Sequence, residues 1–101
     1  MVRINIMYPK KKGAKFDYDY YLKQHVPMIK ECYGEALKRI EVYQGVRGHN
    51  ISPFITVASM WFENFEEFRN IFEKHREKVM KDRSKFYSVQ PVIQVEKQIL
   101  G

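Results

Sequence analysis

The chain has 101 residues and a formal net charge of +6, and 45% of its residues are hydrophobic, 15% aromatic and 30% charged. This aromatic content argues against a disordered chain, and no apolar run is long enough to span a membrane, so no membrane partner is expected. A single cysteine excludes an internal disulfide framework and the first residues show no signal-peptide pattern, so we expect one cytoplasmic domain over residues 1–101.

The positive charge is spread along the chain. Residues 10–12 are consecutive lysines in a loop, but most other basic residues alternate with glutamate, as in EEFRNIFEKHREKVMKDR, which is typical of a solvated helix surface. RNA-binding domains of small α+β type need exposed aromatic residues on their central strands. Nearly half of the aromatic residues fall on predicted helices instead, and residues 2–8 offer Arg3, Asn5 and Met7 on their polar side, so no nucleic-acid partner is expected.

The first half of the chain predicts three strands and one helix. Residues 2–8 alternate between apolar and polar side chains, as a half-buried strand does. A helix is expected to begin after an N-cap at Asp17 and to stop at Gly34. Residues 39–46 and 54–62 then predict two more strands.

The second half predicts one helix and a final strand. Asn64 is the expected N-cap of a helix that ends near Lys81, and Glu67 stands where a capping box requires an acidic residue. Residues 89–99 predict the last strand, in which Pro91 indicates a sheet edge or a bulge.

This order of elements, β-α-β-β-α-β, predicts an α+β fold of ferredoxin-like type. In that sandwich a four-stranded antiparallel sheet carries both helices on one face. The other face has no cover within the monomer, although residues 54–62 carry apolar side chains on both faces. A second copy of the chain is therefore expected to cover it, giving a homodimer through the sheet face.

Two histidines fall on the expected apolar faces of the helices. At about 100° per residue, His25 lies in the same arc as Tyr21 and Leu22, and His75 lies in the apolar arc of the second helix. Both imidazoles are expected to point between helices and sheet. Pro27 falls on the solvent side, which allows either an outward-facing kink or a helix that ends near His25 and restarts after Pro27.

A buried neutral imidazole needs hydrogen-bond partners. Tyr21 lies one turn before His25, and the strands offer further polar candidates, namely Asn5, Thr56, Ser59, Gln90 and Gln94. Two interpretations stay open. The histidines are either satisfied core residues, or acid–base groups in a polar pocket, for which an ordinary pKa of about 6.5 is suitable.

A protein-only metal site is not expected. Along a helix His25 and Cys32 are separated by about 10 Å, and no carboxylate joins the histidines on the expected inward arcs. Cys32 is expected to be a packing residue. Nothing indicates a cofactor, although haem or a flavin remains compatible with the sequence.

Five stretches in order resemble the EthD family: MYP (7–9), FDYDYYLKQHVPM (16–28), FENFEEF (62–68), FEKHREKVMKD (72–82) and YSVQPVIQV (87–95). The spacing of Tyr20 and Tyr21 to His25 and Pro27 is similar to that family's pattern. The resemblance implies a dimeric α+β barrel with its site in the cleft between helices and sheet. It also connects the chain to ethyl tert-butyl ether degradation, and so implies an oxidoreductase or another enzyme that needs little help from cofactors.

We therefore expect an enzyme that acts on a small apolar organic molecule. His25 is the expected general acid or base, Tyr21 orients it or donates to the substrate, and His75 with Gln90 positions the ligand. Further residues expected to contact the ligand are Tyr20, Met28, Cys32 and Phe72. The alternative is a non-catalytic binding or carrier module, in which the histidines only hydrogen-bond the ligand.

Overall fold

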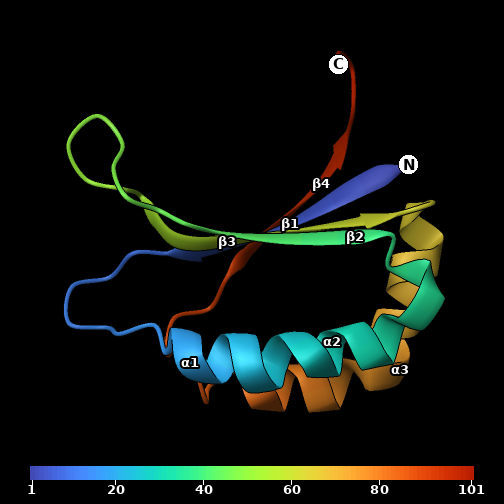
Figure 1. The fold of residues 1–101 in the computed structure, drawn as a ribbon, viewed down its shortest axis with the longest axis horizontal. Helices are drawn as coiled ribbons and strands as arrows, with labels where there is room; N and C mark the ends of the chain where they lie inside the picture. The colour runs from blue at the N-terminus through green and yellow to red at the C-terminus, as the bar shows by residue number, and fades with distance from the viewer.

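The computed structural model describes all of residues 1–101 and has the expected α+β architecture (Figure 1). Strands β1 (Val2–Pro9), β2 (Arg39–Gln44), β3 (Phe54–Phe62) and β4 (Val92–Lys97) form one antiparallel sheet in the order β2-β3-β1-β4. The helices all lie on one face of this sheet, and the other face is bare (Figure 1). The prediction of a ferredoxin-like sandwich is confirmed.

Strand β4 is shorter than the sequence indicated. It begins at Val92 and not at residue 89, and it is an edge strand that pairs only with β1. Pro91 lies immediately before it, where the missing backbone N–H removes no ladder hydrogen bond.

The first helix contains a π-turn directly before Pro27. It runs without interruption through α1 (Tyr18–Tyr20), η1 (Tyr21–His25) and α2 (Val26–Tyr33). The N–H of Val26 donates to the carbonyl of Tyr21, five residues earlier. Pro27 directly follows the π-turn and is exposed, so it lies on the solvent side of the helix as the sequence indicated. The helix therefore continues past His25 and does not end there.

The π-turn decides which residues of the first helix face the sheet. The buried residues of the whole first helix recur at every fourth position: Tyr21, His25, Ile29 and Tyr33. Leu22, expected on the apolar face, is instead 52% exposed. A turn closed by i→i+5 bonds holds more residues than an α-turn, so a uniform rotation of 100° per residue misplaces side chains within it.

Capping residues fix the helix ends as the sequence indicated. Asp17 accepts a hydrogen bond from the backbone N–H of Tyr20, and Gly34, at φ 54°, ends α2. The second helix, α3 (Phe65–Arg83), is capped by the side chain of Asn64, which accepts from the N–H of Glu67 at 2.9 Å. None of these helices is both long and apolar enough to cross a lipid bilayer.

The hydrophobic core between helices and sheet has two parts. One combines aliphatic and aromatic side chains and includes Ile4, Ile29, Met60 and Phe62. The other, which we call the aromatic cluster, consists of Tyr8, Phe16, Tyr21, Phe86 and Tyr87. Its rings meet mostly edge to face or tilted, with centroids 4.8 to 6.2 Å apart, an arrangement that stabilises aromatic pairs.

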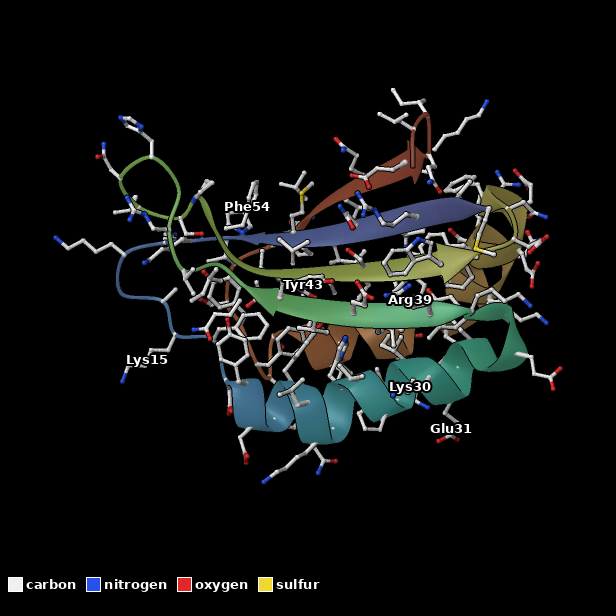
Figure 2. All side chains as sticks on the ribbon, turned by 45° about the horizontal axis from the view of Figure 1, so that its top comes forward. Lys15, Lys30, Glu31, Arg39, Tyr43 and Phe54 are labelled. Atoms are coloured by element: carbon white, nitrogen blue, oxygen red, sulfur yellow. The ribbon has the colours of Figure 1, made fainter.

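The bare face of the sheet is more polar than expected. Ser59 donates to the side chain of Asn5 at 2.6 Å, and Asn5 donates to Glu96 at 2.9 Å. The guanidinium of Arg39 lies over the Trp61 ring, 5.2 Å from its centroid. Figure 2, turned so that this face comes forward, labels Arg39 on β2, while Lys30 and Glu31 lie on α2, on the other side of the sheet.

Candidate functional site

A cavity lies between the sheet and the helices, beside the buried histidine. Its volume is about 80 Å³, and 14 of the 17 residues that line it are hydrophobic. The other three are His25, Arg83 and Pro91. Met80, on α3, and Ile93, on β4, also line it and are 40% and 52% exposed, so the cavity reaches the surface between these two elements.

His25 is held against one wall of this cavity by a carboxylate. Its side chain belongs to the π-turn and only 6% of the residue is exposed. The Nδ1 atom lies 2.9 Å from Oδ2 of Asp82. An ionised carboxylate only accepts hydrogen bonds, so Nδ1 carries the proton and Nε2 keeps its lone pair. Nε2 has no hydrogen-bond partner in the protein and is available to a ligand in the cavity.

Asp82 is itself fixed by a tyrosine. The hydroxyl of Tyr20 donates to Oδ1 of Asp82 at 2.6 Å, while Oδ2 accepts from His25. Burial acts to raise the pKa of Asp82, but the hydrogen bonds from Tyr20 and His25 outweigh it, so the pKa lies below its usual value. Asp82 therefore stays ionised at neutral pH and holds the imidazole in one tautomer.

Burial lowers the pKa of His25 below its ordinary value of 6.5, and the nearby Asp82 only partly offsets this effect. At neutral pH the imidazole is therefore uncharged. An uncharged imidazole with a free Nε2 lone pair can accept a proton from a bound molecule and return it later.

Aromatic rings pack around His25 and restrict its rotation. The Tyr21 ring is stacked on it, with centroids 5.5 Å apart and planes at 20°, and the Phe86 ring lies at 4.5 Å. Phe86 follows the end of α3 in a tight turn, where its N–H and that of Tyr87 both donate to the carbonyl of Arg83. The carbonyl of Phe86 in turn accepts from the N–H of Asp17, so this turn ties the end of α3 to the start of the first helix.

Three phenols add hydroxyl groups to the cavity lining. Tyr8, Tyr21 and Tyr33 all line it, and burial raises the pKa of each well above the ordinary value of 10. These phenols stay protonated near neutral pH, so they offer hydrogen bonds but no negative charge.

The structure brings together some of the residues that the sequence indicated. His25, Tyr21 and Phe72 line the cavity. Tyr20 does not line it, but it contacts the site through Asp82. Met28 and Cys32 are half-buried and pack against the part of the core that includes Ile4 and Ile29.

The expectation that two imidazoles share one cavity is wrong. His75 is partly exposed and does not line the cavity, and neither does the exposed Gln90. His75 lies two helical turns before Asp82 and so shares its side of α3, which faces the first helix. The residues of α3 that line the cavity form a neighbouring row on the same helix and include Phe68, Phe72, Val79 and Arg83.

Sequence reasoning missed Asp82 and Arg83, because it ended the second helix at Lys81 and assigned both residues to a loop. A signal for them was present. Arg83 follows Val79 by four residues, and Asp82 follows it by three, so a longer helix would have turned both towards the same interior as Val79. The expectation that no carboxylate joins the inward residues was therefore also wrong.

The chain contains no group of three or more His, Cys, Asp or Glu side chains that could hold a metal ion. The lining residues that carry polar side-chain atoms are His25, Arg83 and the three tyrosines.

Comparison with known proteins relates both sequence and structure to one family. The sequence model of the EthD domain family matches residues 13–90 of this chain. An EthD-like protein from Ralstonia eutropha JMP134 is 26% identical, with a TM-score of 0.92 over 98% of this chain and 92% of that one. An ethyl tert-butyl ether degradation (EthD) family protein from Bacillus halodurans C-125 is 17% identical, with a TM-score of 0.76 over 98% and 99% of the two chains.

HapK from Hahella chejuensis shares the fold at 12% identity, with a TM-score of 0.65 over 98% of this chain and 93% of that one. The sequence has no significant match among curated proteins.

Proposed function

Since this chain belongs to the EthD family, we propose that it is an enzyme that transfers a proton to or from a small, largely apolar organic molecule, with His25 as the general base and acid. One observation carries the proposal. The Nδ1 atom of His25 is held by Asp82, while Nε2 is left free at the wall of an apolar cavity.

The surroundings of His25 suit this role. A neutral imidazole accepts the proton at Nε2, and the cation that forms lies against the ionised Asp82, which stabilises it. Most residues around the base are hydrophobic, and such a surrounding strengthens this attraction relative to water. Tyr21 also belongs to the lining, and its ring stacks on the imidazole and so orients the base. The oxidoreductase activity that the family resemblance implied stays a prediction, and proton transfer is the step that His25 itself can perform.

The test uses acetophenone, a small apolar ketone whose methyl protons exchange with solvent after removal by a base. In D₂O, the protein should accelerate deuterium incorporation, followed by NMR. His25→Gln should lower this acceleration by roughly 10²- to 10⁴-fold, the usual contribution of one general base. The matched controls are His49→Gln, at an exposed loop residue, and His75→Gln, outside the cavity; both should exchange at the wild-type rate.

Two results would contradict the proposal. If acetophenone binds without faster exchange, the cavity belongs to a binding or carrier module. If His25→Gln folds and exchanges at the wild-type rate, His25 is not the base.

We also propose that the chain forms a homodimer through the bare face of its sheet. The support is the mixed surface of that face, where Trp61, Met7 and Val57 lie beside the polar network of Asn5 and Ser59 with no helix over them. Sedimentation equilibrium at micromolar concentration should give twice the monomer mass of 12.2 kDa; a species of 12.2 kDa would contradict it.

We further propose that residues 1–101 form one EthD-like domain. The matched range of 13–90 leaves out β1 and β4, but these two strands pair with each other in the same sheet as the matched β2 and β3. A cytoplasmic location stays a prediction.

A further inference from the structure

Arg83 is the cationic residue of the cavity lining, and its charge has no partner. It is the last residue of α3, and its Nε and Nη1 atoms are buried without a hydrogen bond to any protein group. No carboxylate forms an ion pair with it. Buried polar groups in native proteins are almost always paired, so such an exception calls for an explanation.

The neighbouring groups cannot neutralise this cation. Each oxygen of the Asp82 carboxylate already accepts a hydrogen bond, one from Tyr20 and one from His25. Tyr8 lies near enough for the charge of Arg83 to act on its phenol, but burial has the larger effect and raises the pKa of Tyr8, so the phenol stays neutral. The C-terminal end of a helix favours a nearby cation, but it supplies no acceptor to Nε or Nη1.

A guanidinium remains protonated in proteins. Partial burial of this charge without a counter-charge is unfavourable, and the fork of N–H donors that Nη2 forms with Nε or with Nη1 matches the two oxygens of a carboxylate or a similar planar anion. Nε and Nη1 are enclosed by protein, whereas Nη2 is neither hydrogen-bonded nor fully buried, so the charge is best met at its Nη2 end by a molecule that enters the cavity.

We propose that Arg83 binds an oxyanion of the ligand, and that the ligand is a small organic acid whose apolar part fills the hydrocarbon-lined cavity. This inference rests on the proposed function, because it names the substrate class for the same cavity. It narrows the expectation of a small, largely apolar molecule: the carbon skeleton contacts the apolar wall, the anionic oxygens contact Arg83, and the reacting proton faces Nε2 of His25.

Benzoate and its neutral isostere nitrobenzene test this inference. Binding of each is measured by calorimetry or ligand-observed NMR at pH 7.5, where benzoate is ionised. Wild-type protein should bind benzoate more tightly than nitrobenzene. Arg83→Met, which keeps much of the side-chain length, should weaken benzoate binding by roughly 10- to 100-fold, as loss of hydrogen bonds to a charged group does, and leave nitrobenzene binding within about twofold. Arg83→Lys, which keeps the charge but loses the fork, should lie in between.

A second readout needs no variant. The Nε–H proton resonance of Arg83 should sharpen and shift in wild-type protein when benzoate is added, and should not do so with nitrobenzene. The inference is overturned if wild type does not prefer benzoate, if Arg83→Met binds benzoate unchanged, or if the Nε–H resonance does not respond.

The outcomes also separate this inference from the proposed function. His25→Gln should keep the preference for benzoate, because Arg83 is intact. A His25→Gln protein that still catalyses exchange contradicts the proposed base but not the anion site. Unchanged benzoate binding in Arg83→Met contradicts the anion site and leaves the role of His25 standing.

Discussion

Asp82→Asn should lower the acceleration of acetophenone deuterium exchange by roughly 10²- to 10⁴-fold, because the orienting carboxylate fixes the tautomer of the base. The carboxylate accepts one hydrogen bond at each oxygen, from Tyr20 and from His25. An amide offers one acceptor oxygen and one donor nitrogen. If its oxygen accepts from Tyr20, its nitrogen faces Nδ1 of His25, and the proton moves to Nε2, which then cannot act as a base.

Tyr20→Phe is the matched control for this prediction. It removes one of the two hydrogen bonds to Asp82 but leaves the bond to His25, so exchange should fall only severalfold. A folded Asp82→Asn protein, judged by circular dichroism, that exchanges at the wild-type rate would show that Asp82 does not position His25.

Phe86→Ala should lower the free energy of unfolding by about 3–5 kcal/mol, the usual effect of deleting a buried phenylalanine ring. Phe86 is 1% exposed, and its ring contacts the rings of Tyr8, Phe16, Tyr21 and His25. Since small domains are stable by only about 5–15 kcal/mol, this single change should remove a large share of the stability. Urea unfolding monitored by circular dichroism measures it.

Phe65→Ala provides the comparison, because Phe65 is also a phenylalanine beside a helix end but is 37% exposed. It should lower the free energy of unfolding by about 1 kcal/mol or less. If both variants have similar effects, the aromatic cluster does not support the histidine as described.

The fold could be predicted because its signals are local and agree with one another. The alternation of apolar residues in β1, the caps at Asp17 and Asn64, and the stop at Gly34 each depend on a few neighbouring residues. The order of the elements then leaves few ways to arrange them. Strand β4 was placed less well, because most of its residues are exposed and its pattern carries little signal.

The site was predicted only in part. His25 and Tyr21 were found because they belong to a row of inward residues with regular spacing. Leu22 was misplaced by the π-turn, which a uniform rotation cannot represent. His75 was misjudged because a helical wheel gives the direction of a side chain but does not distinguish the row that faces a cavity from the row that faces another helix.

Asp82 and Arg83 were missed for a different reason. Charged residues in a run such as EKVMKDR are usually solvated, and only the tertiary structure shows that the last turn of α3 is packed against the first helix and the aromatic cluster. The spacing from Val79 indicates the direction of both side chains once the helix is extended, but their burial depends on where the helix ends in space.

The central claim is that His25 is a neutral base, with its proton on Nδ1 and its lone pair at Nε2 in the cavity. A pH titration of the ¹⁵N-labelled imidazole by NMR tests it most directly. The account predicts a protonated Nδ1 and an unprotonated Nε2 at pH 7, and protonation of Nε2 with a pKa below 6.5. A proton on Nε2 at pH 7, or a pKa at or above 6.5, would contradict it.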